Sequence, residues 1–461
     1  MKNNIEFYNS ISGRKETFKP INSSQVLLYG CGPTVYDAPH LGNFRTFIFY
    51  DLTIRVLELN DFSVKSVINI TDIDDKIIGR ANSEKVAYDK ITSKYESIFI
   101  DQWKRLNNQL PTHFIRATEN ISEMISFIED LLSNNFAYVV NGSVYFDSKN
   151  SKIDYDKFVS NEDIHEDPNS EKKFQSDFAL WKAWKKEDEE IFWDSPWGKG
   201  RPAWHTECSV IASNFLGNSI DIHCGGIDLK FPHHQNESVQ VEALSKKIFT
   251  RYWLHSEHLL LEEDKMSKSL GNILSVQSLE EEFSLESIRL FLMTAHYRSK
   301  ITFNKNLLIE SEKMISKIER FIDNFNLRLD SKKFKNYDFV NEEIDFINAL
   351  NDDLNTPKAL GVFFNFINDF NKKNNSSAGN IKNAEREKAE SFINLFNSVF
   401  QCLSVGKSNP LSDNIKDLLQ TREKARAEKN WELADQVRDS LSNLGWIVED
   451  TPKGQKVVRK K

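Results

Sequence analysis

The chain has 461 residues and a formal net charge of −8; 39% of its residues are hydrophobic and 28% are charged. This length predicts more than one domain, and the composition is ordinary for a soluble globular protein. No stretch stays apolar for about 18 residues, which excludes a membrane span, and the polar start lacks the core of a signal peptide, so we expect a cytoplasmic protein. The acidic charge does not exclude a nucleic-acid partner, because binding needs only a local basic face.

The early part of the chain predicts a Rossmann-type parallel α/β sheet. Residues 26–29 form an apolar run stopped by Gly30, residues 44–57 look helical, and residues 64–70 read as a second strand. A strand–helix–strand order of this kind is typical of parallel sheets. Residues 84–134 look mainly helical, and two β-rich runs flanking Asn141-Gly142 predict a hairpin.

Later segments predict a third strand and then mainly helices. Residues 220–223 read as a strand that ends near Gly225-Gly226, and from about residue 306 the apolar residues recur at helical spacing, as Ile318, Phe321 and Phe325 do. Residues 422–439 read as a charged amphipathic helical segment, and residues 445–454 as a short strand and a turn.

One constellation predicts a phosphate site at a helix start. Residues 31–43 join the first strand to the first helix, and a helix start offers free amide groups and partial positive charge to an anion. Gly42 lets a flat base or a phosphate come close, and His40 and Asn43, three residues apart, can both donate to phosphate oxygens. Read alone, the segment also fits a plain helix start with a surface histidine.

A second signal lies far downstream. Lys265 and Lys268, three residues apart and interleaved with serines, would form a cationic loop able to neutralise a leaving pyrophosphate. A solvated basic loop without a function has the same composition. Taken together, His40-Leu41-Gly42-Asn43 resembles the HIGH motif of class I aminoacyl-tRNA synthetases, and residues 265–269 match their KMSKS motif letter for letter. Asn43 replaces the final histidine; it keeps a donor amide but cannot carry a positive charge.

Four cysteines lie far apart, which favours metal or catalytic use over a disulfide framework. Cys31 and Cys208, with His233 and Glu237 four residues apart, make a donor set suited to zinc. Each cysteine could equally be a small buried hydrophobe, and spacing does not choose between His233 and its neighbour. For the two remaining cysteines, Cys224 and Cys402, we favour packing.

The blocks at 31–37, 69–76, 204–209 and 221–237 resemble the signature blocks of the cysteinyl-tRNA synthetase family. By that resemblance one Zn²⁺ per chain would be held by Cys31, Cys208, His233 and Glu237 and would bind the substrate thiolate. Zinc prefers thiolate to alcohol, so one metal bond could reject serine without an editing domain.

The resemblance also implies substrate contacts. Thr71, Trp204 and His223 would contact cysteine, and catalysis would involve His40, Asn43, Lys265 and Lys268. ATP, with Mg²⁺, would be bound by His40, Gly42, Asn43, Gly225, Gly226, Asp228, Lys265 and Lys268. Cys224 stands where the family usually has a glycine. The anticodon of tRNA(Cys) would be contacted by Arg426, Trp431, Asp435 and Asp450, because aromatic stacking and carboxylate contacts suit unstacked bases.

We therefore expect a monomeric cysteine–tRNA ligase without a membrane partner. Its domains would be a catalytic domain over 1–305, with an insertion at about 115–200 and a stem-contact and KMSKS region at about 255–305, a helical bundle over 306–405, and an anticodon-binding domain over 406–461. Two alternatives are a ligase that joins cysteine to an amino sugar, which the C-terminal module argues against, and a non-catalytic zinc-dependent RNA-binding protein, which the intact 265–269 motif argues against.

Overall fold

The computed structural model describes residues 4–150, 155, 158, 171–261, 274–329, 341–374, 381–403, 413–444, 446–451 and 454–459. The chain folds into two compact units, residues 1–403 and 404–461. Among the described residues, no helix combines the length and apolar character needed to cross a bilayer.

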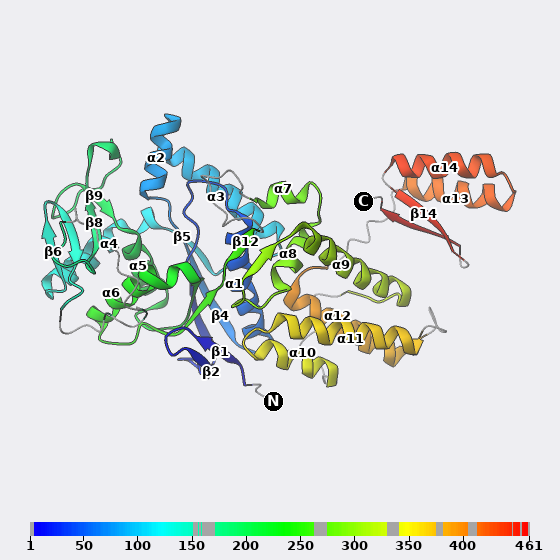
Figure 1. Ribbon diagram of the computed structural model, residues 1–461, viewed down its shortest axis with the longest axis horizontal. Coiled ribbons are helices and arrows are strands. Elements are labelled where there is room, and N and C mark those ends of the chain that lie inside the picture. Colours follow the sequence, from blue (N-terminus) through cyan, green and yellow to red (C-terminus); the bar gives the residue numbers. More distant parts are fainter. Residues whose placement is uncertain are drawn as a thin grey trace. The chain divides into compact units, whose positions relative to one another are not determined.

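A five-stranded parallel sheet forms the centre of the first unit, in the order β11-β10-β3-β4-β5 (Figure 1). Its strands are β3 (Gln25–Gly30), β4 (Ser63–Ile70), β5 (His113–Arg116), β10 (Ile220–Gly226) and β11 (Thr250–Ser256). The predicted parallel α/β fold and the strands at 26–29, 64–70 and 220–223 are confirmed. Residues 84–134 are mainly helical, as predicted; the strand β5 within them was not foreseen, because a four-residue strand is too short to show a period of its own.

Six α-helices of the described residues up to Ser245 accompany this sheet. They are α1 (Leu41–Leu59), α2 (Asp75–Glu84), α3 (Tyr88–Arg105), α4 (Ile121–Ser133), α5 (Trp204–Leu216) and α6 (Gln235–Ser245). In α1, thirteen of nineteen residues are buried, so this helix lies inside the core instead of covering it. The middle of α1 lies against the end of β3, where the Tyr50 hydroxyl donates to the Cys31 carbonyl over 3.0 Å.

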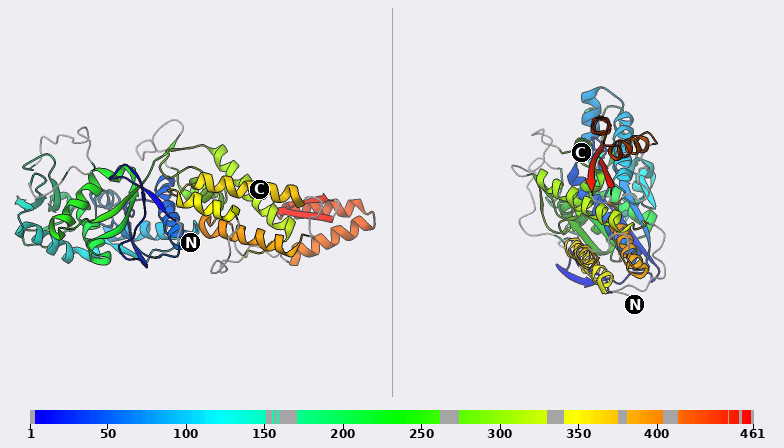
Figure 2. Two further views of the ribbon diagram at one scale, coloured as in Figure 1. Left: turned by 90° about the horizontal axis from the view of Figure 1, so that it is seen from below. Right: turned by 90° about the vertical axis from the view of Figure 1, so that its right-hand side faces the viewer.

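The insertion forms a separate antiparallel sheet of four strands. Its strands are β6 (Ala137–Val140), β7 (Ser143–Phe146), β8 (Phe178–Ala183) and β9 (Gly200–Pro202). The predicted hairpin is confirmed: Asn141 and Gly142 take φ values of 48° and 84°, as a tight β6–β7 turn requires. Figure 2 shows this sheet at one end of the first unit and the helical bundle at the other.

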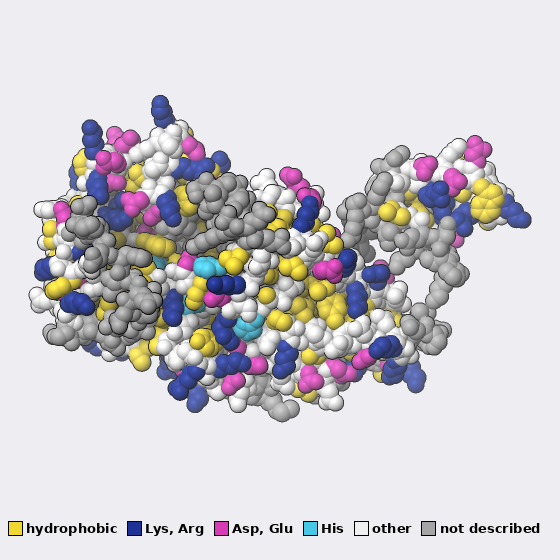
Figure 3. Space-filling view, viewed as in Figure 1, with side chains coloured by type: hydrophobic (Ala, Val, Ile, Leu, Met, Phe, Trp, Pro, Cys, Tyr) yellow, Lys and Arg dark blue, Asp and Glu magenta, His cyan; other side chains and the backbone are white. Residues whose placement is uncertain are grey.

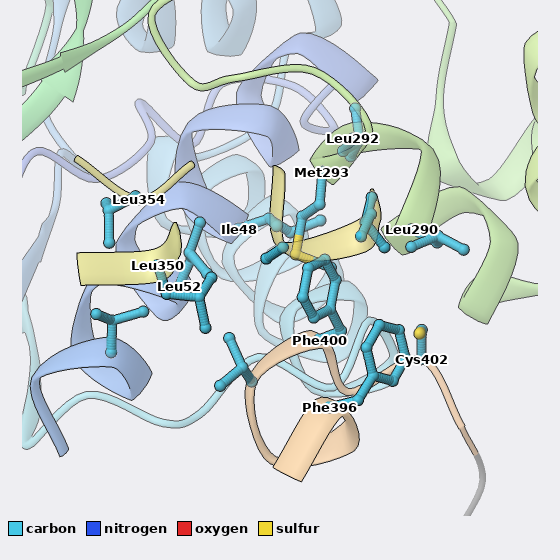
Figure 4. Packing of buried hydrophobic residues seen from close by; sticks show 14 of the residues in the cluster. Ile48, Leu52, Leu290, Leu292, Met293, Leu350, Leu354, Phe396, Phe400 and Cys402 are labelled. Carbon is cyan, nitrogen blue, oxygen red and sulfur yellow. The ribbon is translucent and has the colours of Figure 1, made fainter. Parts of the chain in front are cut away.

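The bundle consists of α9 (Lys305–Phe325), α10 (Asn341–Asn351), α11 (Thr356–Asn374) and α12 (Asn383–Phe400). It shares a hydrophobic core with α1 and with α8 (Leu285–Met293). In Figure 4, Ile48 and Leu52 of α1 lie among Met293, Leu350 and Phe400 from three other helices. Because this core is continuous, the middle of α1 packs directly against the bundle.

The second unit contains α13 (Asp413–Ala427), α14 (Trp431–Asn443) and the hairpin β14 (Trp446–Thr451) with β15 (Gly454–Arg459). The helical segment predicted over 422–439 is in fact split into two helices. Lys429 takes a positive φ of 60°, and the Asn430 side chain caps α14 by accepting from the Leu433 amide. A left-handed residue followed by an N-cap ends one helix and starts the next.

Candidate metal centre and nucleotide cleft

Two parallel strands end at the same edge of the sheet and place the first functional residues there. Cys31 directly follows β3, and β10 ends at Gly226. The Cys31 amide donates to the Cys224 carbonyl over 3.2 Å, which joins the two strand ends. In open parallel sheets ligands bind outside the carboxyl ends of the strands, so this edge is where a site is expected.

Four buried donors from separate segments meet at this edge: Cys31, Cys208, His233 and Glu237 have ligand atoms that all lie within 4.8 Å of one another. The two sulfur atoms are 4.0 Å apart, and Glu237 Oε1 is 3.6 Å from Cys31 Sγ and 3.0 Å from His233 Nε2. Cys208 comes from the first half of α5, His233 from the short segment Lys230–His234, and Glu237 from the first turn of α6. Two thiols, an imidazole and a carboxylate at these separations can surround a single cation.

The charges within this cluster are strongly coupled. Burial alone would raise the pKa of Cys208, but the hydrogen bond from Cys31 and the charge of His233 bring it to about 6. Burial also opposes the charge of Glu237, yet His223 and His233 lower its pKa to about 2. His233 keeps a proton, with its pKa raised to about 10 against burial by Glu237 and Cys208. A bound metal cation would offset the same negative charges of Cys208 and Glu237.

A second set of buried donors shares two members with the first. Cys31, His223, His234 and Glu237 also have ligand atoms within 4.8 Å of one another. The structure thus brings both His233 and His234 to the cluster, where the sequence alone could not choose between them.

Trp204 covers the cluster on the cleft side. Its ring stacks on His233 with a centroid separation of 4.0 Å, and the residue remains 38% exposed. Thr71 and His223, predicted to contact cysteine, are fully buried. The Thr71 hydroxyl donates to Glu207 Oε2 over 3.1 Å, and Thr34, which pairs with Thr71, lines the cleft instead.

A cleft of two adjoining hollows, about 270 and 200 Å³, starts at Cys31 and Trp204. Both hollows are lined by His40, Asn43, Thr46, Gly226 and Asp228. Gly42 lines the second hollow. Five of the predicted nucleotide residues, together with Cys31 of the metal cluster, therefore line adjoining hollows: His40, Gly42, Asn43, Gly226 and Asp228.

Gly225 lies behind the cleft wall. A Cβ atom at this position would come within 2.3 Å of the His234 ring, so the absence of a side chain serves packing against that imidazole. At Gly226 a Cβ would meet Asp228 Oδ1 at 2.5 Å. These two glycines hold His234 and Asp228 close to the end of β10.

His40 and Asn43 bind each other across the first turn of α1. His40 Nδ1 accepts from the Asn43 amide over 3.2 Å, and Asn43 Oδ1 accepts from the His40 amide over 3.0 Å. This reciprocal cap uses the carbonyl oxygen of the Asn43 side chain. Its Nδ2 group is then the one placed to donate to a ligand in the cleft.

Lys265 and Lys268 lie outside the described residues, but both flanks of their segment are described. On one side β12 (Leu259–Leu261) pairs with β13 (Ile301–Phe303). On the other side Leu274 O accepts from the Leu41 amide over 2.8 Å, and Ser275 forms a bridge with His40. The residues that directly follow the segment with both lysines therefore contact the start of α1.

The predicted anticodon residues lie in the second unit. Trp431, at the start of α14, is 58% exposed, and the Arg426 guanidinium lies 5.9 Å from its ring centroid. Asp435 is paired with Arg438 at 3.0 Å. Asp450 belongs to β14, and its side chain lies outside the described residues.

Several residues of this site were not predicted from the sequence. His205 Nδ1 lies 2.8 Å from His233 Nδ1, and the fully buried Glu207 accepts from Thr71. Arg45, two residues beyond Asn43, is buried and donates to the carbonyls of His296 and Ser299. A charged residue within a hydrophobic helical stretch was the available signal for Arg45, whereas its partners are more than 200 residues away.

Comparison with known proteins agrees with this architecture. Residues 17–313 match the family model described as tRNA synthetases class I (C) catalytic domain, and residues 345–405 match the DALR domain. The Mycobacterium tuberculosis methionyl-tRNA synthetase bound to methionyl-adenylate superposes with a TM-score of 0.56 at 13% identity, covering 82% of this chain and 90% of that one. The Agrobacterium radiobacter LeuRS–tRNA–LeuAMS complex gives 0.57 at 9% identity, covering 83% and 84%. The fold is that of the class I aminoacyl-tRNA synthetases.

The more specific matches come from sequence. Residues 408–457 match the cysteinyl-tRNA ligase anticodon binding domain. The cysteine–tRNA ligase of Brachyspira hyodysenteriae is 38% identical, over 99% of both chains, and that of Caldicellulosiruptor saccharolyticus is 38% identical over 99% of this chain and all of the relative. The chain therefore belongs to the cysteine–tRNA ligase family.

Proposed function

We propose that this enzyme activates L-cysteine with ATP, releasing pyrophosphate, and transfers the cysteinyl group from the adenylate to the 3′ end of tRNA(Cys). In the first step the cysteine carboxylate attacks the α-phosphate; in the second a hydroxyl of the terminal adenosine attacks the acyl carbon. Neither step needs a side-chain nucleophile. Positioning and electrostatic stabilisation by the cleft supply the catalysis.

The four-donor cluster supports selection of cysteine by zinc. Cys31, Cys208, His233 and Glu237 would hold the ion, because two thiols, an imidazole and a carboxylate this close together form a zinc donor set. The pKa values of Cys208 and Glu237 are lowered to about 6 and about 2, whereas burial and the neighbouring Cys208 and Glu237 raise the pKa of Cys31. The ion supplies Lewis acidity that binds thiolate in preference to alcohol. Trp204, stacked on His233, lines the cleft beside this position.

The other residues divide between ATP and tRNA. Asp228 would accept from the ribose hydroxyls, with Gly225 and Gly226 keeping the strand end compact. His40, Gly42 and Asn43 would bind phosphates beside Lys265 and Lys268, with Mg²⁺ accompanying ATP. In the C-terminal unit Trp431 offers an exposed stacking surface, and Arg426, Asp435 and Asp450 would contact the anticodon. The domain boundaries stay those of the three-domain prediction.

The single observation that carries this proposal is the convergence of two cysteine sulfurs 4.0 Å apart at the end of a nucleotide-sized cleft. The test is Cys208→Ser. Because the variant loses a soft ligand, it should lose bound zinc and at least about 100-fold of cysteine-dependent pyrophosphate exchange, with the fold retained. Metal content, exchange with cysteine and serine, and circular dichroism would be measured.

Cys402→Ser is the matched control. Cys402 is as deeply buried as Cys208 but lies in the bundle core, so its variant should keep zinc and cysteine activation. If Cys208→Ser activates cysteine as the unmodified enzyme does, thiolate recognition by a metal at this cluster is wrong.

A further inference from the structure

Cys31 and Glu237, which belong to both donor sets, each contact residues of the first set and residues of the second. Glu237 Oε1 lies 3.0 Å from His233 Nε2, whereas its other oxygen, Oε2, lies 2.8 Å from His223 Nε2. Cys31 Sγ is 4.0 Å from Cys208 Sγ and 3.3 Å from His234 Nε2. A carboxylate with one oxygen toward each neighbour, beside a thiol between two groups of donors, has the arrangement of bridging ligands.

The two histidines of the second set are fully buried and firmly held. His223 lies on β10, where its ring stacks on Trp253 at 4.5 Å. His234 packs against Gly225, where a Cβ would come within 2.3 Å of the ring. Neither imidazole can turn away without disturbing the core, so the Nε2 atoms of both rings stay directed at the shared donors.

A hydrogen-bonded chain behind His234 suits it to metal binding. His234 Nδ1 lies 2.8 Å from His255 Nε2, and His255 Nδ1 lies 2.7 Å from Ser10 Oγ. With a cation at Nε2, the hydrogen of His234 sits on Nδ1 and is donated to His255, which in turn donates to Ser10. Ligand histidines in proteins are usually oriented by such a contact at the second ring nitrogen.

We propose that Cys31 and Glu237 bridge a second divalent cation of the zinc type, held on its other side by His223 and His234. This second site rests on the proposed zinc function, because it shares two ligands with the first. Paired metal sites of this kind hold ions about 3.5–4 Å apart. When free zinc is high, the shared ligands donate to two ions, which weakens thiolate binding at the first and raises the KM for cysteine.

The test uses the full chain at buffered free zinc concentrations. The unmodified protein should saturate at two zinc equivalents, bound in two separate steps, and His234→Gln at one. His113→Gln, which removes an exposed imidazole on β5, is the control and should still bind two. Cysteine-dependent pyrophosphate exchange in the same buffers should show a KM for cysteine that rises with the second equivalent in the unmodified protein and stays constant in His234→Gln.

Each stoichiometry has its own meaning. A plateau of one equivalent in the unmodified protein overturns the second site and leaves the first intact, with His223 then acting only to orient Glu237. If the unmodified protein binds no zinc, both proposed metal sites are wrong. Two equivalents in His234→Gln and also in His223→Gln would place the second ion elsewhere. If one of these variants fails to fold, ¹¹³Cd NMR of the unmodified protein decides: two resonances support the site and one overturns it.

Discussion

Asp51 shows how a single residue of α1 ties the catalytic domain to the bundle. Its fully buried carboxylate accepts from Arg55 Nε over 2.8 Å, from the Gln109 amide over 2.7 Å, and from Arg289 of α8. Arg289 also donates to the Phe400 carbonyl at the end of α12 over 2.6 Å. One charge pair therefore joins three segments that are remote in the sequence.

We expect Asp51→Asn to destabilise the first unit by about 3–5 kcal/mol, because Arg289 is left buried without a counter-charge. The midpoint of denaturant unfolding at neutral pH measures this. Asp369→Asn is the control: Asp369 is 76% exposed and pairs with Lys372, so its loss should cost less than about 1 kcal/mol. Equal effects of the two changes would contradict the argument.

The same residue predicts a pH dependence. Burial alone would raise the pKa of Asp51, but Arg289 and Arg55 hold it below its ordinary 3.8. A depressed folded-state pKa stabilises the fold above the unfolded pKa, and this stability is lost as the pH falls through the folded value. The stability gap between the unmodified protein and Asp51→Asn should be constant from pH 7 to 5 and should shrink below about pH 4. Unfolding midpoints across this range would test it.

At the level of elements, α1 combines a polar start with an apolar body. Its first turn lines the cleft, while Ile48 and Leu52 lie in the shared core (Figure 4). His40 and Asn43 cap this turn by accepting from each other's amide groups. The Leu41 amide donates to the carbonyl of Leu274, which follows the segment carrying Lys265 and Lys268. A shift of the start of α1 would therefore act on Leu274, the first described residue after the segment that carries both lysines.

Two substitutions of Asn43 distinguish the capping role of its side-chain oxygen from the proposed donor role of its side-chain amide group. Asn43→Asp keeps the oxygen that accepts from His40 but replaces the amide donor with a negative charge, so stability should hold while the KM for ATP in pyrophosphate exchange rises. Asn43→Ala removes both groups and should also cost about 1 kcal/mol of stability. Normal exchange by Asn43→Asp would show that the amide does not contact ATP.

Across the whole molecule, the chain is built as two units with separate cores. Leu419, Val437, Leu441 and Val448 form the core of the second unit, apart from the clusters of the first. Among the described side chains on the face of the first unit seen in Figure 3, Lys and Arg are interspersed with Asp and Glu. The exposed Trp431 makes the second unit the better place for contacts with bases.

Truncation after Leu403 tests whether the first unit activates cysteine while the second unit contacts tRNA. Since the first unit holds the whole cleft, the truncated protein should keep cysteine-dependent pyrophosphate exchange but lose most aminoacylation of tRNA(Cys). Trp431→Ala in the full chain should reproduce the second effect, with a loss of about 1–3 kcal/mol in kcat/KM for tRNA. A truncated protein that charges tRNA normally would exclude an anticodon role for this unit.

Much of the fold and part of the site could be predicted from local sequence. The Asn141-Gly142 hairpin and the helix after His40 depend on hydrogen bonds between residues that are close in the chain, so a short window contains their causes. The strand at 26–29 was predicted from its apolar run alone, because its partners β4 and β10 are distant in the sequence. The family resemblance rested in the same way on short blocks. The strand β5 was missed because four residues in a largely helical region carry too little pattern.

Tertiary structure was needed for everything that joins distant segments. Cys31 and Cys208 are separated by 177 positions, and no local sequence pattern predicts that their sulfur atoms lie 4.0 Å apart. The pairing of Asp51 with Arg289, the second donor set around His223 and His234, and the burial of Thr71 behind Thr34 depend equally on how the sheet orders its strands. Local patterns specify which elements form, whereas packing of their buried faces specifies which side chains meet.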